Sequence, residues 1–410
     1  MASRELSSTR LSVASWVIYD MGSTLFFSGV VGLVFPLWVT DVMGGDDATV
    51  GYTLTASMLV VFFLSPVLGT LSDRLKRRMP FLLTLTIVGV ISTLSIGTFQ
   101  YPLSIALFCV AVSSVYLSGI FYNGLLADIA TKNNVGFVGG IGVGVGYFGG
   151  ILAVILGFFF LELKGHIFLF RTMAIFILLL SVPLIVTGKY KLDDSFKLPV
   201  KKILMHTFLV TFRAVSHTVD NKSWLWFLIA RFWYLWAISA ASFFAVLYGV
   251  NTVNLTEREV QLVLLVGIIT GIPMGALWGR VVDRVGPLLI LRANVAMWVF
   301  LLALAAAIPI LDLAKELWWV VGLMSGSALA GLYVSERPYV LSIAPKNRVG
   351  EYFGIFNMAG RLAAIAGPFS WGFISVTLGL GQSAAIVCLA VCALFAFFTL
   401  TLVKGSGEEI

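Results

Sequence analysis

The chain has 410 residues, of which 59% are hydrophobic and only 11% are charged, and its mean hydropathy is +1.00. Because soluble domains carry about 25% charged residues, this composition excludes a water-soluble fold. The formal net charge is +7, but the positions of the basic residues, described below, account for it without a nucleic-acid partner.

Hydrophobic runs follow one another along the whole chain. A helix needs about 20 apolar residues to cross the roughly 30 Å of bilayer hydrocarbon, and twelve runs approach or exceed that length. We therefore predict an all-α membrane protein with twelve spans. The expected spans are 13–40, 49–72, 80–98, 101–127, 137–160, 167–188, 223–249, 258–280, 286–308, 316–341, 350–375 and 381–403.

Lysine and arginine are concentrated on one side of these spans. If the N-terminus is inside, the inner segments hold 20 of the 27 basic residues. Since inner loops of membrane proteins are enriched in lysine and arginine, we expect both termini in the cytoplasm. The positive charge then lies beside anionic lipid, and we expect a multi-pass protein of the bacterial inner membrane.

A polar stretch, residues 189–222, separates six spans from the next six. Within it, apolar residues recur at helical spacing beside basic ones, which favours an amphipathic helix on the inner membrane surface; a coiled linker is the alternative. The apolar residues are Leu204, Phe208, Phe212, Val215 and Val219. We expect a six-helix bundle in residues 1–188 and another in residues 223–410.

Two sequence motifs occur once in each half. The octapeptide "IATKNNVG" (129–136) returns as "IAPKNRVG" (343–350), 214 residues later and with six of eight positions identical. The pattern Gly-x-x-x-Asp-Arg begins at Gly69 and again at Gly279, 210 residues later. Two markers at nearly the same offset indicate a duplicated unit of six spans.

This parallel duplication resembles the layout of major facilitator transporters, whose two halves rock about a central site. The Gly-x-x-x-Asp-Arg turn is similar to the signature of that superfamily between spans two and three. The resemblance implies that the turn helps to close an inner gate; a merely solvated charged turn is the alternative. The expected gating residues are Gly69, Asp73, Arg74, Asp128, Gly279, Asp283 and Arg284.

Three longer segments point to a narrower family. "WVIYDMGSTLF" (16–26), "YNGLLADIATKNNVGFVGGIGVGVGYFGG" (122–150) and "EYFGIFNMAGRLAAIAGPFSWG" (351–372) resemble the vacuole-effluxer-like family, which is related to the autophagy amino-acid effluxer of yeast vacuoles. The resemblance implies export of amino acids. However, Leu235, Trp236 and Ala237 replace the Asn-Asp-Gly that follows the span-seven tyrosine in that family. Substrate and coupling therefore do not carry over directly.

Five charged residues lie inside the predicted spans, where each costs about 2.5–3.5 kcal/mol on insertion. They are Asp20, Arg231, Glu336, Arg337 and Arg361. Such residues normally face the bundle interior or a water-filled cavity. We expect Arg231 and Arg361 to contact an anionic group of the solute, because a guanidinium binds carboxylates bidentately.

Trp16, Tyr19 and Asp20 share a helix face by their spacing. Asp20 is thus a candidate proton carrier or partner for a substrate amine, and a structural counter-ion for an arginine is the alternative. Glu336 and Arg337 are adjacent and point about 100° apart, so one of them is expected to serve helix packing. The remaining expected contacts to the solute are Asn123, Trp233, Tyr234 and Trp236.

Glycines recur every fourth residue in two spans. Span five carries Gly142, Gly146 and Gly150, and span eight carries Gly267, Gly271 and Gly275. Small residues at this spacing let membrane helices approach closely. In the resembled major facilitator fold, spans five and eight pack against each other across the boundary between the halves, so the resemblance implies that the ridges lie there, where the bundles would tilt; static packing is the alternative.

These features together predict a secondary active transporter for a small carboxylate-bearing or zwitterionic solute such as an amino acid, possible partners being that solute, protons and the bilayer. The alternatives are an exporter or flippase of amphipathic drugs or charged-headgroup lipids, and a non-transporting receptor or scaffold. The three histidines lack zinc-ligand spacing, so no metal is expected. No serine-hydrolase elbow or phosphate-binding glycine loop stands in a strand–turn–helix context, so no cofactor or enzymatic activity is expected. We expect a monomer.

Overall fold

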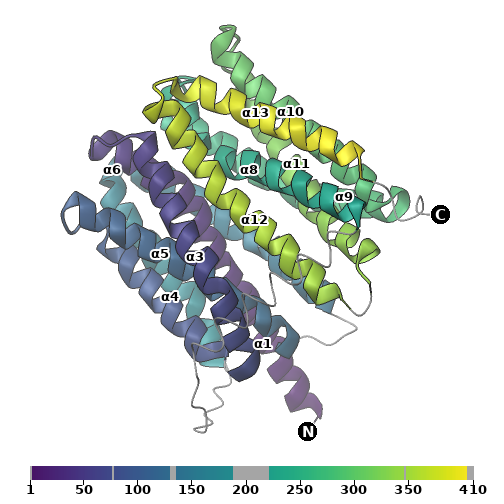
Figure 1. Ribbon diagram of the computed structural model, residues 1–410. Coiled ribbons are helices and arrows are strands. Elements are labelled where there is room, and N and C mark those ends of the chain that lie inside the picture. Colours follow the sequence, from purple (N-terminus) through teal and green to yellow (C-terminus); the bar gives the residue numbers. More distant parts are fainter. Residues whose placement is uncertain (1, 76–77, 130–134, 188–220, 346–347, 404–410) are drawn as a thin grey trace. The chain divides into compact units, whose positions relative to one another are not determined.

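A computed structural model describes residues 2–75, 78–129, 135–187, 221–345 and 348–403 (Figure 1). Its described residues form helices and their connections, with no strand among them. The first half contains α1 (Ala2–Leu25), which continues through η1 (Phe26–Val34), α2 (Phe35–Leu37) and η2 (Trp38–Val42), followed by α3 (Asp47–Leu75), α4 (Arg78–Ser95), α5 (Tyr101–Ile129) and α6 (Val135–Thr187).

The second half begins after the predicted linker, of which only residues 221 and 222 lie within the described ranges. It contains α8 (Lys222–Asn251), α9 (Glu257–Val285), α10 (Pro287–Ile310), α11 (Leu317–Ile343), α12 (Val349–Gly372) with its continuation η3 (Phe373–Thr377), and α13 (Gly381–Thr401).

Local sequence explains where several helices begin and end. Thr256 and Glu259 form a capping box at the start of α9, in which each side chain accepts a hydrogen bond from the backbone N–H of the other. The Asn221 side chain accepts from the Trp224 N–H at the start of α8. Gly286 ends α9 with a φ of 88°, a conformation that glycine adopts without steric cost, and Pro287 opens α10 at the first helical position.

Twelve spans are confirmed. Ten described helical segments are long and apolar enough to cross a membrane. One of them, Gly144–Thr187, contains two of the predicted spans, because Gly165 interrupts α6 with φ 77° and ψ 174°. The 24-residue helix α12 supplies the remaining span.

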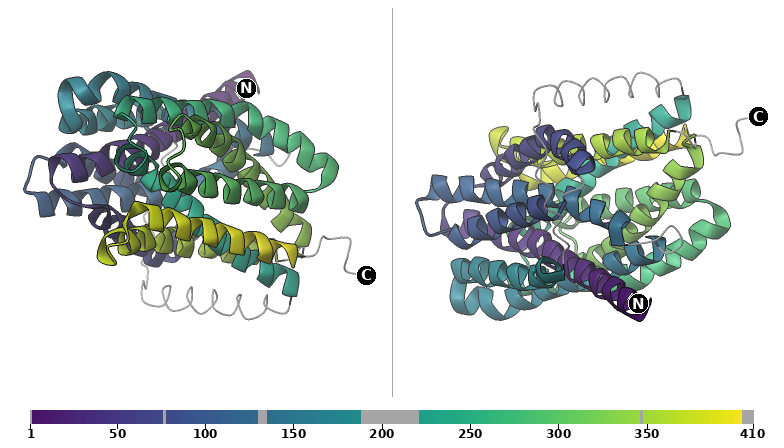
Figure 2. Two further views of the ribbon diagram at one scale, coloured as in Figure 1. Left: turned by 90° about the horizontal axis from the view of Figure 1, so that it is seen from above. Right: turned by 90° about the horizontal axis from the view of Figure 1, so that it is seen from below.

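The helices pack into two compact units. The first comprises residues 1–43 and 56–207, and the second comprises residues 44–55 and 208–410. In the first unit α1 packs against α6 and α4 against α5; in the second α9 packs against α11, and α8 against α12 and α13 (Figures 1 and 2). Each unit thus has its own interior.

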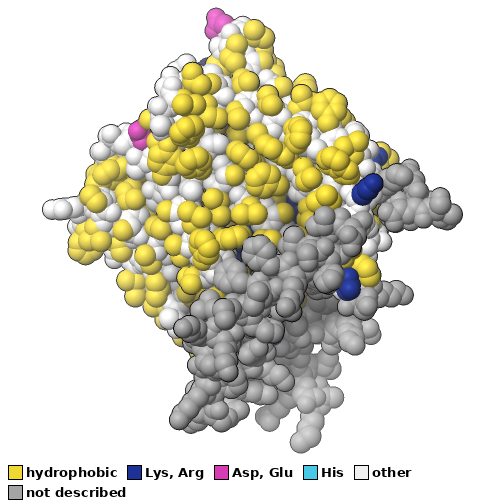
Figure 3. All heavy atoms as spheres, viewed as in Figure 1, with side chains coloured by type: hydrophobic (Ala, Val, Ile, Leu, Met, Phe, Trp, Pro, Cys, Tyr) yellow, Lys and Arg dark blue, Asp and Glu magenta, His cyan; other side chains and the backbone are white. Residues whose placement is uncertain are grey.

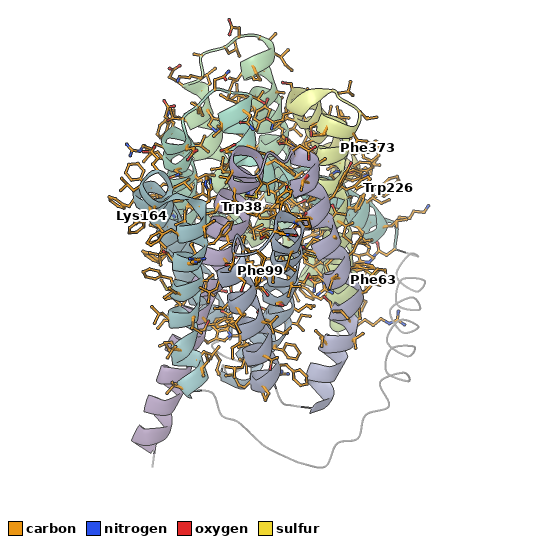
Figure 4. The ribbon with its side chains drawn as sticks, turned by 90° about the vertical axis from the view of Figure 1, so that its left-hand side faces the viewer. Trp38, Phe63, Phe99, Lys164, Trp226 and Phe373 are labelled. Atoms are coloured by element: carbon orange, nitrogen blue, oxygen red, sulfur yellow. The ribbon has the colours of Figure 1, made fainter. Side chains whose placement is uncertain are left out.

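Aromatic side chains fill the interior of the first unit. The rings of Phe35 and Phe108 are stacked, and Trp38 meets Phe170 edge to face with 5.9 Å between ring centroids. Trp38 is completely buried among the helices, whereas Lys164 lies at their margin (Figure 4). Aromatic pairs of this kind add to the stability gained from burial alone.

The outside of the helices is apolar. Phe159, Leu163 and Val186 expose 58%, 74% and 76% of their surface. Hydrophobic side chains are spread over the described part of the face in Figure 3, where few charged side chains are seen. Soluble proteins rarely expose contiguous apolar patches larger than a few hundred Å². This surface suits contact with lipid chains.

The start of α3 is packed within the second unit. Trp371 Nε1 and Gln382 Nε2 donate hydrogen bonds of 2.8 and 2.7 Å to Asp47 Oδ2. Gly51 lies directly against the carbonyl oxygen of Pro368, too close to admit a side chain. Residues 44–55 are therefore held by α12 and α13, although the rest of α3 belongs to the first unit.

Candidate functional site

Helices α8 and α11 bring together three of the predicted site residues in the second unit. Arg231 Nε lies 3.4 Å from Glu336 Oε1, and Arg231 Nη2 donates a 3.4 Å hydrogen bond to Oε2. Tyr234, one turn after Arg231, donates a 2.6 Å hydrogen bond to Oε1 of the same carboxylate. All three side chains are buried, so they form a closed ionic network inside the unit.

Helix α12 completes the surroundings of Arg231. Its Nη1 donates a 2.6 Å hydrogen bond to the Phe356 carbonyl, and its guanidinium carbon lies 3.5 Å from the centroid of the Phe356 ring. Gly360 leaves room for the guanidinium, because a methyl group there would lie 2.6 Å from Nη1. Buried charges are stable when they are paired and hydrogen-bonded in this way.

The expectation that Arg231 offers an uncompensated charge to a solute is therefore wrong. Glu336 neutralises it, and Tyr234 donates its hydroxyl to the same carboxylate. Trp236 is half-buried, stacks on Trp233 with 5.1 Å between centroids, and donates a 2.8 Å hydrogen bond to Ser370.

The remaining in-span charges of the second unit differ from this pair. Arg337 is exposed, as its 100° rotation from Glu336 predicts. Arg361 on α12 is half-buried, and none of the described side chains forms an ion pair or hydrogen bond with it. Arg361 is thus a half-buried cation within a span, and its charge has no partner among the described residues.

Asp20 is the corresponding carboxylate of the first unit. It is half-buried on α1, and no ion pair joins it to a lysine or arginine among the described residues. Its Oδ2 lies against Gly146 of α6, where a methyl group would approach it to 2.5 Å. It also interacts with the Tyr122 hydroxyl, which makes no hydrogen bond of standard geometry. No counter-ion for Asp20 is thus present in the described first unit.

Trp16 and Tyr19 flank Asp20 but are largely buried. Trp16 donates a 3.0 Å hydrogen bond to the Tyr122 carbonyl and stacks on the Tyr122 ring with 4.5 Å between centroids. The Tyr19 hydroxyl is hydrogen-bonded to Thr86 at 2.7 Å and to Ser118 at 3.1 Å. These two residues position α1 against α4 and α5. Tyr122, central to this cluster, was not among the expected site residues, and only its neighbour Asn123, which is exposed, was.

The glycine ridges contact helices of their own units. Gly142 and Gly146 face Trp16 and Asp20 of α1. Gly267 faces the backbone of Gly322 on α11, and Gly275 faces Ala330. Gly150 and Gly271 are buried as well. The ridges thus bring α1 to α6 and α9 to α11, and their placement at the boundary between the halves stays a prediction.

The expected gating residues are described only in part. The side chains of Asp73, Arg74 and Asp128 lie outside the described set, while a methyl group at Gly69 would meet nothing within 4 Å. In the second copy of the motif, Gly279 packs on Val334, and both Asp283 and Arg284 are exposed. Among the described residues, no group of three histidine, cysteine, aspartate or glutamate side chains could hold a metal ion.

Comparisons with known proteins agree with this architecture. The Major Facilitator Superfamily model matches residues 21–368 and 250–408. An uncharacterized MFS-type transporter, YxiO of Bacillus subtilis (strain 168), is 23% identical over 406 residues, which cover 93% of this chain and 91% of YxiO. A multidrug resistance protein, MdtG of Dickeya zeae (strain Ech586), is 29% identical over 125 residues, which cover 30% and 29% of the two chains.

A solved structure shows the same fold. The nucleoside transporter NupG, in a mutant form, superposes with a TM-score of 0.77, covering 96% of this chain and 100% of NupG at 14% sequence identity. At that identity the likeness concerns the fold alone.

Proposed function

Since the chain belongs to the major facilitator superfamily and is a secondary transporter by its fold, we propose that its passenger is a small solute with a carboxylate group. A zwitterion such as an amino acid is the leading candidate. We infer that the protein lies in the cytoplasmic membrane of a bacterium, in keeping with the basic inner segments of its sequence and with its bacterial relatives.

The observation that carries this proposal is the unpaired guanidinium of Arg361. Keeping a charge at membrane depth is costly, and a buried charge is normally paired. Arg231 has its partner in Glu336, whereas Arg361 has none among the described residues. A solute carboxylate would supply the missing partner, because the guanidinium fork matches its two oxygens.

Asp20 gives the proposal its second charge. A carboxylate without a described cation can bind an ammonium group, or it can take up a proton and couple transport to a proton gradient. The sequence resemblance to the vacuole-effluxer-like family supports amino acids and the export direction. Alternating access would use the two Gly-x-x-x-Asp-Arg turns as inner gates.

The decisive experiment is transport by the purified protein in liposomes. The assay measures exchange of radiolabelled amino acids across the membrane, without a proton gradient, for the parent chain and for Arg361→Gln. We expect exchange to fall at least tenfold, because roughly 1.4 kcal/mol of binding free energy corresponds to each tenfold change. Arg258→Gln is the matched control: it removes an exposed arginine in the first turn of α9 and should retain exchange.

Asp20→Asn separates the two roles of the carboxylate. If Asp20 carries the proton, the variant keeps exchange but loses stimulation by an imposed proton gradient. If it binds the ammonium group, exchange itself is lost. A variant that retains both exchange and stimulation would remove Asp20 from the proposal, and amino acids that are not exchanged even by the parent chain would reject this solute class.

A second candidate is an exporter of amphipathic drugs that carry a charged group. The partial similarity to a multidrug resistance protein favours it. The same liposomes distinguish the candidates, because a drug exporter would transport cationic dyes and leave amino acids unexchanged.

A further inference from the structure

Helices α9 and α11 pack side by side in a constant, parallel register. Gly267 faces Gly322, Gly275 faces Ala330, and Gly279 faces Val334. The members of each pair are 55 residues apart, which is possible only if both helices run in the same direction along their contact. We call this line of contact the α9–α11 seam.

One side of the seam is closed. Trp278 Nε1 donates hydrogen bonds of 3.1 and 3.2 Å to the carbonyl and the hydroxyl of Ser327. On the same side, Asn294 of α10 contacts Gly331, and α10 packs along α11. This side of the seam is therefore filled by protein.

The other side carries three arginines. Each helical residue is rotated about 100° from the one before it, so Arg280 projects from the flank of α9 opposite to Trp278. Arg284, about 140° from Gly279 by the same rotation, projects farther from α11. By the same rotation, Arg337 projects from α11 toward that flank, on the side opposite to Gly331. In the 55-residue register Arg337 is level with Val282, midway between Arg280 and Arg284.

All three arginines are exposed, and no described side chain pairs with them. The nearest carboxylate on α9 is Asp283, which is also exposed. With Asp283 included, the cluster keeps two net positive charges. Their mutual repulsion is relieved when an anion binds between them.

Apolar surface lies immediately beside the cluster. On α11, Tyr333 and Leu341 stand one turn before and one turn after Arg337 on the same exposed row, with 53% and 55% of their surfaces exposed. The arginines occupy the last turns of α9, the end that the distribution of basic residues assigns to the inner membrane surface. A cationic site of this kind, bordered by apolar side chains at headgroup depth, matches the two parts of a phospholipid.

We propose that Arg280, Arg284 and Arg337 bind the phosphate group of an anionic phospholipid along the open side of the α9–α11 seam. The guanidinium groups make charge-assisted, bidentate hydrogen bonds to the phosphate oxygens. The first acyl carbons contact Tyr333 and Leu341. A free phosphate ion shares the headgroup chemistry but lacks the acyl chain.

The test measures lipid binding to the purified full-length chain by native mass spectrometry, with phosphatidylglycerol and phosphatidylcholine as competing probes. The double variant Arg280→Gln/Arg337→Gln leaves the Gly-x-x-x-Asp-Arg turn intact. The double variant Lys164→Gln/Arg258→Gln removes the same charge from two exposed positions elsewhere. We expect phosphatidylglycerol binding to fall at least fivefold in Arg280→Gln/Arg337→Gln and to be retained in Lys164→Gln/Arg258→Gln.

Two further arms keep the proposal falsifiable. Arg280→Lys/Arg337→Lys, which keeps the charge, should retain more phosphatidylglycerol binding than the glutamine variant. Inorganic phosphate at millimolar concentration should not displace the lipid. Equal phosphatidylglycerol binding by the parent and the glutamine variant would overturn the site, and displacement by inorganic phosphate would overturn the lipid as its ligand.

Discussion

At the scale of single residues, the Arg231–Glu336 pair can be tested through stability. Glu336→Gln leaves a buried guanidinium without its counter-charge, and breaking such a pair costs about 3–5 kcal/mol. We expect a clearly lower melting temperature in detergent than for the parent chain. Arg337→Gln removes the neighbouring, exposed charge and should leave the melting temperature nearly unchanged. Equal melting of the two variants would show that the pair does not stabilise the second unit.

Sequence reasoning identified the in-span charges but not their pairing. A charged residue inside an apolar run is visible in the sequence because of its insertion cost, and all five candidates lie on described helices. Their pairing is not visible, because Arg231 and Glu336 are 105 residues apart and meet only through the packing of α8 on its neighbours. Tyr122 was missed for the same reason: a tyrosine in an apolar run carries no signal that it will stack on Trp16.

At the scale of helices, the α9–α11 seam predicts a sharp difference between two glycines. A methyl group at Gly326 would collide with the Gly267 carbonyl oxygen, whereas at Gly354 on α12 it would meet nothing within 4 Å. Gly326→Ala should therefore destabilise the protein by about 1–3 kcal/mol through overpacking. Gly354→Ala should be neutral or slightly stabilising, since alanine favours helix more than glycine. Thermal unfolding of the two variants under identical conditions measures the difference, and a stable Gly326→Ala chain would contradict the close approach.

The glycine ridges also show the limit of helical patterns. Spacing of four residues establishes that one helix face is free of side chains, and the structure does bring backbones together there. The spacing does not say which helix will occupy the face. The resemblance to the major facilitator fold implied a helix of the opposite half, whereas the nearest described neighbours of these glycines lie within their own unit.

At the scale of the whole molecule, orientation in the membrane is the expectation most open to a direct test. In a background in which Cys109, Cys388 and Cys392 are replaced by serine, Lys315→Cys introduces an exposed thiol in the turn that precedes α11. We expect a membrane-impermeant maleimide to label it in intact cells. Arg284→Cys, at the opposite end of α9, should be labelled only after the membrane is opened, and labelling of both in intact cells would reject cytoplasmic termini.

The number and positions of the spans were predictable because composition alone decides which segments enter a bilayer. Span three, for example, was expected at 80–98 and lies at Arg78–Ser95. The compact units were less predictable, since residues 44–55 belong to the second while the sequence pattern divides the chain after span six. Hydrogen bonds from Trp371 and Gln382 to Asp47 hold residues 44–55 in the second unit, and no spacing rule in the sequence reveals these bonds.

The packing of residues 44–55 within the second unit has a consequence for expressing the two halves as separate polypeptides. If the chain is divided within residues 189–222, Asp47 stays in the N-terminal fragment. Trp371 and Gln382, whose side chains donate hydrogen bonds to it, then belong to the C-terminal fragment and lose their acceptor. The fragments should therefore accumulate better when they are synthesised together in one cell than when either is synthesised alone.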